Sequence, residues 1–274
     1  MKLSVAIPTY NSSVHLKQLL DSLIRSKEIY EIVIRDDGSM PTELEQLEKL
    51  VLDFRRKSKI KIKVHLDKIN QGAFHNKYNC VEKCKGDIVY LIDSDNVVMN
   101  NLDNFIKKTL IPEFDRNSIY YASRVYQFFY FNKMYRSLYK LNKKYKIKFF
   151  NNDTIFSLKD VKEHIENYEE GNRGKFIDKH ILWFLNTGNF FVDRNSFIEI
   201  FKEGKKINRE ILSIDAIVFS YLWLKSGKQI ISKKDHYYYH RKRKDSVSFT
   251  EKDSYDISLK YLIDEFKKLK TIEK

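Results

Sequence analysis

The 274-residue sequence carries 51 Lys and Arg against 37 Asp and Glu, a formal net charge of +14, and 14% of its residues are aromatic. The aromatic content excludes a disordered chain, and a composition of 8 Gly and 3 Pro excludes a collagen-like or linker protein. Two Cys cannot build a disulfide scaffold, and no apolar run approaches the roughly 20 residues that span a bilayer. We therefore expect a basic globular protein of the cytoplasm.

The charge is divided unequally along the chain. Residues 1–110 have a net charge of +3, and the remaining residues have +11. Of the basic residues 39 are Lys and 12 are Arg, an excess that suits a solvated surface and is also typical of a biased genome composition. The charge alone is therefore compatible with an anionic partner for the second part of the chain or with a Lys-rich surface of no specific function.

Strands and helices alternate through residues 1–110. Short apolar runs predict buried strands at 3–7, 32–34, 60–66 and 87–92. Helical periodicity predicts helices that begin at 11–13, near Pro41 and at Ala73, the second of them framed by Ser39 and Glu43 as a capping pair. This order predicts an α/β fold with a mainly parallel sheet and helices on both faces.

Polar clusters follow each of these strands, at 9–11, 36–37, 70–77 and 93–95. Ligands of parallel sheets bind at the carboxyl ends of the strands. Asp93 and Asp95 offer hard oxygen ligands that suit Mg²⁺ or Mn²⁺, although an isolated Asp-x-Asp is also a common turn. A glycine-rich phosphate loop is missing after the first strand, which argues against a dehydrogenase or a P-loop NTPase.

Four of these segments together resemble a known family. The runs VAIPTYN (5–11), RDDGS (35–39), NQG (70–72) and KGDIVYLIDSDN (85–96) are similar in order and spacing to the inverting family-2 glycosyltransferases of GT-A fold. The resemblance implies transfer of a sugar from a nucleotide sugar with the help of Mn²⁺ or Mg²⁺. It further implies a nucleotide-sugar-binding half at 1–110, an acceptor-binding and catalytic half at 111–250, and a closing amphipathic helix within 251–274.

The resemblance also implies roles for individual residues. Asp93, Asp95 and His240 would bind the metal, and Asn96 stands where the family often has a further Asp. Asp37 would accept a hydrogen bond from a uracil-type base, and Lys77, where the family usually has Arg, would reach the base or the diphosphate. The implied nucleotide-sugar-binding residues are Pro8, Thr9, Tyr10, Asp36, Asp37, Lys77, Asp93, Ser94, Gly188, Asn189 and Arg241.

Asp215 is the candidate general base. It opens a helical pattern at the point where the family usually has an acidic pair, and one carboxylate suffices to deprotonate an acceptor hydroxyl. The alternative is an acidic residue that only interacts favourably with the helix dipole. The acceptor would be a hydroxyl of a glycan, a lipid-linked molecule or a protein.

The segment 132–148 contains seven Lys or Arg and no acidic residue, and its apolar residues recur at helical spacing. It is predicted to be an inserted basic amphipathic helix, which either contacts an anionic membrane or acidic acceptor, or packs on the sheet as scaffold. The other histidines, His236 among them, have no metal-binding spacing and are expected at the surface or the core edge.

Other functions compete with this interpretation. A catalytically inactive GT-A-like protein that binds a nucleotide sugar or glycan would also fit the single acid at 215. A nucleic-acid-binding protein would use the basic second part of the chain. This hypothesis does not explain the acidic residues at the strand ends, and we therefore expect no nucleic-acid partner. A nucleotidyltransferase should carry a Gly-rich, Arg-containing loop after its first strand, which this sequence does not have.

Overall fold

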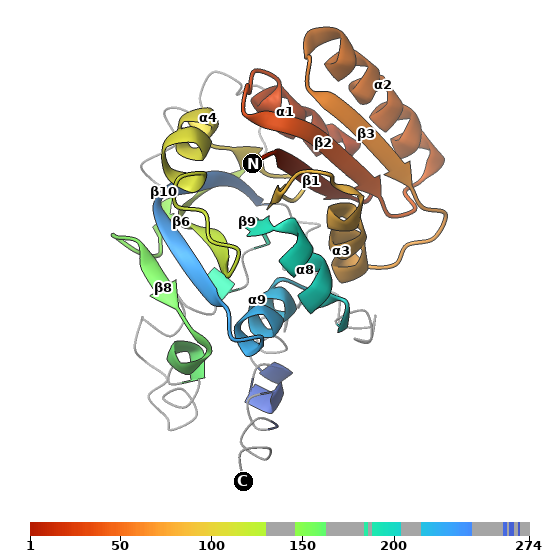
Figure 1. Cartoon of the computed structure of the whole chain (residues 1–274). Helices are drawn as coiled ribbons and strands as arrows, with labels where there is room; N and C mark the ends of the chain where they lie inside the picture. The colour runs from red at the N-terminus through yellow and green to blue at the C-terminus, as the bar shows by residue number, and fades with distance from the viewer. Residues whose placement is uncertain are drawn as a thin grey trace.

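A computed structural model of the chain describes residues 1–129, 146–162, 184–185, 188–203, 215–242, 260–261, 263–265 and 268. Within these residues the centre of the molecule is a ten-stranded sheet (Figure 1). Its main path runs β3-β2-β1-β4-β9-β6-β10-β5, with β7 paired to β6 and β8 to β10. The strands are β1 (Leu3–Thr9), β2 (Ile29–Asp36), β3 (Lys61–Leu66), β4 (Ile88–Leu91), β5 (Val97–Val98), β6 (Ser118–Phe129), β7 (Lys146–Lys148), β8 (Thr154–Phe156), β9 (Phe190–Asp193) and β10 (Gln229–Lys242).

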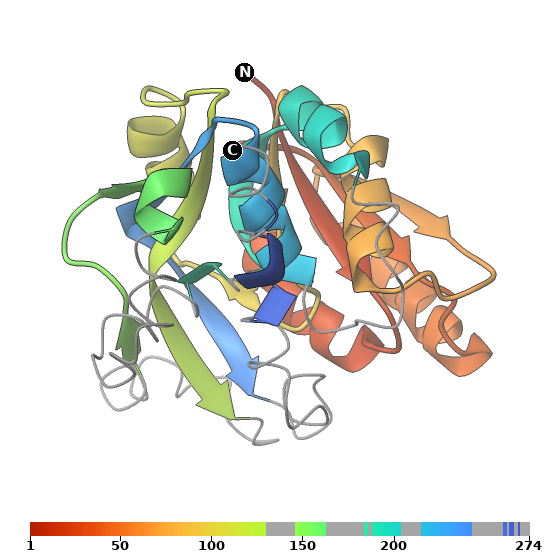
Figure 2. The same cartoon turned by 90° about the horizontal axis from the view of Figure 1, so that it is seen from below.

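The helices lie on both faces of the sheet (Figures 1 and 2). They are α1 (Ser13–Leu23), α2 (Pro41–Lys57), α3 (Ala73–Lys83), α4 (Leu102–Phe105), the π-helical turn η1 (Ile106–Leu110), α8 (Arg194–Phe201) and α9 (Asp215–Lys225). β1 separates two hydrophobic cores, because alternate side chains of a strand point to opposite faces. Val5 and Ile7 belong to the core under α1, α2 and α4, whereas Ala6 belongs to the core under α3, α8 and α9. The predicted α/β fold with a mainly parallel sheet and helices on both faces is therefore confirmed.

Strand direction changes in the second part of the sheet. β1 to β4 are all parallel, as the alternation of strands and helices predicts. β9 then pairs antiparallel with both β4 and β6, and β10 runs parallel to β6. As a result, the carboxyl ends of β1, β2, β4 and β10 and the start of β9 all meet at one edge of the sheet.

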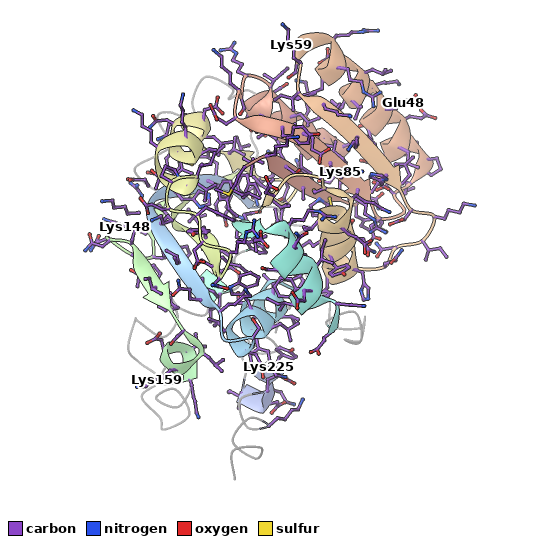
Figure 3. The ribbon with its side chains drawn as sticks, viewed as in Figure 1. Glu48, Lys59, Lys85, Lys148, Lys159 and Lys225 are labelled. Carbon is purple, nitrogen blue, oxygen red and sulfur yellow. The ribbon has the colours of Figure 1, made fainter. Side chains whose placement is uncertain are left out.

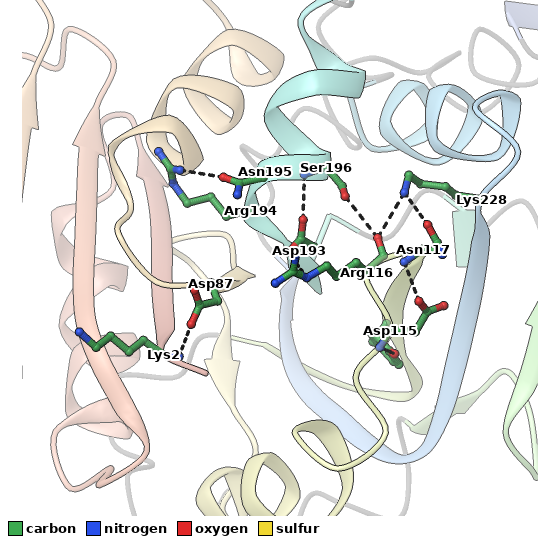
Figure 4. Close-up of polar contacts among 11 residues, drawn as sticks. Lys2, Asp87, Asp115, Arg116, Asn117, Asp193, Arg194, Asn195, Ser196 and Lys228 are labelled. Carbon is green, nitrogen blue, oxygen red and sulfur yellow. Dashed lines mark hydrogen bonds and ion pairs between the residues drawn. The ribbon is translucent and has the colours of Figure 1, made fainter.

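The opposite edge is held by ordinary polar contacts (Figure 4). The main-chain N–H of Lys2 donates to Asp87 Oδ2 over 2.8 Å, just before β4 begins. Asp193, at the end of β9, caps α8 by accepting from the N–H of Ser196 over 2.9 Å, and Arg116 Nε lies 3.7 Å from its other oxygen. These contacts join the starts of β1, β4 and β6 and the end of β9 along this edge.

Three local predictions are wrong. Met40, not Ser39, is the N-cap of α2, and Glu43 instead accepts from the N–H of Ser13, so this carboxylate joins α2 to α1 and does not close a capping box. Lys146–Lys148 form β7 on the edge of β6 instead of a helical turn, while residues 132–145 of the basic segment lie outside the described residues. His236 is fully buried among aromatic rings, since its position on β10 points it into the core and not outward.

The exposed lysines and the helical residues near the C-terminus agree with the sequence analysis. Labelled lysines such as Lys59, Lys85, Lys148, Lys159 and Lys225 are exposed and lie on the periphery of both halves (Figure 3). The residues that the structure describes within the predicted C-terminal helix (260–261, 263–265 and 268) are helical, and Tyr261 and Ile263 pack on the core under α9. In the part of the chain that is described, no helix has the length and apolar character needed to cross a membrane.

Candidate active site

The candidate site lies where the strand order reverses. The chain passes from β1 to β2 and β3 on one side and then returns to place β4 on the other side of β1. Such a reversal leaves a crevice at the carboxyl ends of the two central strands. Thr9 is the last residue of β1, and Asp93 follows the end of β4 by two residues. The predicted polar clusters therefore meet at the position where parallel sheets bind ligands.

Asp36 and Asp37 are buried at the end of β2 and directly after it. Asp36 accepts from the N–H and the hydroxyl of Ser39, which closes the turn. The two oxygens of Asp37 accept from the N–H groups of Gln71 and Gly72 over 3.0 and 2.9 Å. Burial raises the pKa of Asp37 above its ordinary value, and these hydrogen bonds offset part of that effect. Both carboxylates thus hold backbone segments in addition to any role in ligand binding.

Lys77 is the centre of the charged cluster. Its Nζ lies 2.9 Å from Asp93 Oδ1 and 2.6 Å from Asp215 Oδ2. The three side chains come from α3, from the turn after β4 and from the first turn of α9. Burial alone would lower the pKa of Lys77, but the two carboxylates outweigh burial and hold the pKa above its ordinary value. The lysine is therefore a fixed positive charge that joins the two halves of the site.

Asp93 is partly buried within this cluster. Burial raises its pKa, the ammonium of Lys77 opposes the shift, and the charges of Asp95 and Asp215 add to it. The N–H of Asp93 donates to Asn189 Oδ1 over 2.7 Å, which fastens the turn after β4 to the start of β9. The two neighbouring strands, one of them antiparallel, thus set the position of this carboxylate.

Gly188 packs directly against the ion pairs. A Cβ atom at this position would lie 2.7 Å from Lys77 Nζ and 2.9 Å from Asp93 Oδ2, both shorter than ordinary van der Waals contact. A larger residue at position 188 would therefore displace these charged side-chain ends, whereas the backbone conformation does not call for glycine. Its predicted place beside the donor-binding residues agrees with this packing.

Arg241 supports the turn that carries the two aspartates. It is 1% exposed, and its Nε donates to the main-chain oxygen of Asp95 over 3.0 Å. Its guanidinium also donates to Gln18 Oε1 on α1, and its N–H donates to Asn96 Oδ1 over 3.3 Å. Arg241 thus ties β10, the turn after β4 and α1 together.

The remaining predicted residues occupy the same edge. Pro8 and Thr9 are buried at the end of β1, Ser94 is buried in the turn after β4, and Tyr10 presents its ring to solvent at 49% exposure. His240 is half-buried near the end of β10. Arg241 follows it directly.

The carboxylates are compatible with a divalent cation. Asp93 and Asp95 provide hard oxygens from alternate positions of one turn, and the charge of Asp95 acts on Asp93. Across the described residues, no three His, Cys, Asp or Glu side chains gather in a way that would hold a metal ion. The role of His240 as a third ligand stays a prediction. The pair fits a cation such as Mg²⁺ or Mn²⁺ that keeps most of its coordination positions for other ligands.

Three supporting residues were missed by sequence reasoning. Asn76 donates from Nδ2 to the main-chain oxygen of Thr9 over 3.1 Å. Gln18 and Asn96 hold Arg241, as described above. Only Asn96 carried a signal in the sequence, since it replaces the acidic residue that the family often has. Its neutral amide oxygen accepts a backbone hydrogen bond here, a role that requires no negative charge.

The order of the strands and the helices on both faces of the sheet are those of a GT-A fold. The family model described as glycosyl transferase family 2 matches residues 4–201. The chain belongs to this family.

Comparisons with individual proteins agree with that assignment. The poly(ribitol-phosphate) β-N-acetylglucosaminyltransferase TarS of Staphylococcus aureus is 32% identical over 102 residues, which is 36% of this chain and 17% of that relative. The crystal structure of S. aureus TarS 1–349 in complex with UDP-GlcNAc has a TM-score of 0.57 at 18% identity, over 90% of this chain and 60% of that one. The structure of GalNAc-T7 with UDP, GalNAc and Mn²⁺ gives 0.56 at 16% identity, over 88% and 43% of the two chains. The match to TarS thus spans about a sixth of that protein.

Proposed function

We propose that the protein is a metal-dependent, inverting glycosyltransferase that transfers a sugar from a UDP-linked donor to an acceptor hydroxyl. The observation that carries the proposal is the cluster of Lys77, Asp93 and Asp215, which joins the strand-end carboxylate of the donor half to a carboxylate of the acceptor half. A donor phosphate site alone would need no carboxylate from α9. A general base that deprotonates the acceptor next to the anomeric carbon would have to come from the acceptor half, which contains α9.

The donor is proposed to bind along the ends of β1, β2 and β4. The exposed ring of Tyr10 offers a face for the base, and Asp37 retains lone pairs for a base N–H beyond the two backbone hydrogen bonds it accepts. Asp93 and Asp95, with His240 as the predicted third ligand, would hold a divalent cation together with the donor diphosphate. When bound, the cation would supply positive charge that stabilises the leaving diphosphate.

Asp215 would act as the base. Its carboxylate takes the proton of the acceptor hydroxyl as that oxygen bonds to the anomeric carbon, and the bond from this carbon to the diphosphate oxygen breaks. Attack and departure occur on opposite sides of the carbon, so the configuration is inverted. The products are the glycoside and UDP, and Asp215 is left protonated.

The acceptor is proposed to be an anionic hydroxyl compound. The +11 net charge of residues 111–274 supports this choice, because a basic surface raises the local concentration of a polyanion. The similarity to TarS, a poly(ribitol-phosphate) β-N-acetylglucosaminyltransferase, also favours an acceptor of this class. A glycan, lipid-linked or protein acceptor with phosphate or carboxylate groups would meet this requirement.

Two measurements test the proposed function. A thermal-shift panel of nucleotides and nucleotide sugars with and without Mn²⁺ should raise the melting temperature most for a UDP sugar with Mn²⁺. With the donor so identified, Asp215→Asn should retain donor binding and lose transfer by about 10²-fold or more. Melting temperatures indifferent to every nucleotide would refute the donor site, and wild-type transfer by Asp215→Asn would remove this residue from the mechanism.

A further inference from the structure

A buried ammonium stands between the two carboxylates of the proposed site. Lys77 is only 7% exposed, and its Nζ contacts Asp93 and Asp215 at 2.9 and 2.6 Å. A surface lysine would sample many rotamers in solvent, but this side chain is enclosed by α3, β4 and α9. Its charge is therefore a permanent feature of the site in the absence of donor.

The ammonium group of Lys77 has little free space around it, because Gly188 packs directly against it. The first atom of any side chain at position 188 would lie 2.7 Å from Lys77 Nζ. The neighbours of Lys77 on α3 that face the core, such as Asn76 and Tyr78, are also buried, so the stem of the lysine is held by the helix position. Only the ammonium group at the end of the side chain can exchange one contact, with Asp93 or Asp215, for another.

Charge balance links this lysine to cation binding. The charges of Asp95 and Asp215 both act on Asp93, and the ammonium of Lys77, which contacts Asp93 and Asp215, opposes them. A divalent cation arriving at Asp93 would meet a like charge on the same carboxylate, which weakens its binding in a partly buried site. A nucleoside diphosphate arriving with the cation brings the negative charge that relieves this repulsion.

We propose that Lys77 is the resident counter-cation of the donor site, which makes binding of a divalent cation depend on a nucleoside diphosphate. The inference rests on the proposed function, in which Asp93 binds the metal. Lys77 is then a positioning residue that acts through Asp93 and Asp215, in contrast to the contact with base or diphosphate that the family resemblance implies. The cation site is completed only when the donor is present.

The test measures Mn²⁺ binding without turnover. Mn²⁺ is titrated into the full-length chain at about pH 8, where carboxylates are ionised, and free Mn²⁺ is followed by electron paramagnetic resonance with and without UDP. Lys77→Met should bind Mn²⁺ without UDP about 10-fold or more tighter than the wild type, because one like charge is removed. UDP should then strengthen Mn²⁺ binding less than it does in the wild type. Lys77→Arg should behave like the wild type.

The chain offers a matched control outside the site. Lys233 is also buried, and its Nζ lies 2.5 Å from both Glu113 and Asp153. Lys233→Met removes a lysine between two carboxylates and should leave Mn²⁺ affinity unchanged. If Lys77→Met does not fold, as judged by its melting curve, Lys77→Gln provides the same loss of charge with a polar end.

Three results would overturn the inference. Mn²⁺ affinity of the Lys77 variants equal to that of the wild type, or an equal gain in Lys233→Met, would show that the lysine does not control the cation. A loss of UDP affinity by 10-fold or more in the absence of Mn²⁺ would make Lys77 a direct donor ligand. Failure of the proposed function gives a different pattern: the wild type then binds no UDP with or without Mn²⁺. In that case the role of Lys77 as a counter-cation is still tested by Mn²⁺ alone. Lys77→Met should bind Mn²⁺ more tightly than the wild type, and the added substitution Asp93→Asn should remove this increase in affinity.

Discussion

Gly188→Ala is the substitution whose effect follows most directly from the geometry. The added methyl group would lie 2.7 Å from Lys77 Nζ and 2.9 Å from Asp93 Oδ2, about 0.7 Å closer than ordinary contact. The backbone at Gly188 is not in the left-handed region, so alanine itself is not strained. The ammonium must move, and because two carboxylates hold it, at least one ion pair lengthens.

The expected magnitude combines two opposing effects. Weakening one hydrogen bond between charged groups costs about 1.5–3 kcal/mol, and the lower end applies because the Asp93 side chain is 32% exposed. Replacing Gly by Ala restricts the unfolded chain and returns about 0.4–1 kcal/mol. The free energy of unfolding should therefore fall by only about 1 kcal/mol, or a few degrees in melting temperature.

Binding should respond more strongly than stability. The methyl group crowds an oxygen of Asp93 that the proposed cation would use, so UDP affinity in the presence of Mn²⁺ should fall by about 10-fold or more. Calorimetric titration with UDP measures the affinity, and scanning calorimetry measures the stability.

Gly227→Ala is the control for this substitution. Gly227 has φ 79° and no atom within 4 Å of its would-be Cβ, so its substitution strains the backbone by about 1–2 kcal/mol without touching the site. Unchanged UDP affinity in Gly188→Ala, with a stability loss like that of Gly227→Ala, would refute the reasoning.

Two further substitutions test the supports of the site and of the core. Arg241→Met removes the donors to the Asp95 main-chain oxygen and to Gln18, and should lower the free energy of unfolding by about 2–4 kcal/mol and weaken Mn²⁺-dependent UDP binding. Chemical denaturation that gives wild-type stability would contradict this role. Burial lowers the pKa of His236 from its ordinary value to about 3, so the unfolded chain takes up a proton below about pH 6.5 that the folded chain does not. Stability is therefore lost as pH falls, on the order of 2–3 kcal/mol between pH 7 and pH 4, and His236→Phe should flatten this dependence. Parallel stability curves for the two proteins would exclude His236 as the cause.

The first half of the fold could be predicted because its signals are local. Buried apolar runs define β1 and β4, and the run at 32–34 locates β2, although this strand extends over Ile29–Asp36. The direction of β9 could not be predicted, because a strand of four residues, three of them apolar, carries no information on which strands it pairs with. The antiparallel insertion between β4 and β6 is set by the packing of the whole sheet.

The site could be predicted as a set of residues but not as a set of contacts. The motif order placed Lys77, Asp93 and Asp215 in one site, but which carboxylate meets the ammonium depends on side chains separated by up to 138 positions. The same limit applies to Arg241. The sequence shows only that an arginine is present, and it does not show whether this arginine contacts a diphosphate or supports the turn at Asp95 from a buried position. Burial and hydrogen-bond partners distinguish these roles, and neither is a local property of the chain.

The central claim is that the turn after β4 holds the diphosphate of a nucleotide sugar through a divalent cation. Calorimetric titration of the wild type and Asp95→Asn with UDP, with and without Mn²⁺, tests it most directly. Mn²⁺ should strengthen UDP binding by the wild type, and Asp95→Asn should lose that increase while it keeps the binding seen without metal. Undiminished UDP binding by Asp95→Asn in the presence of Mn²⁺ would contradict the claim.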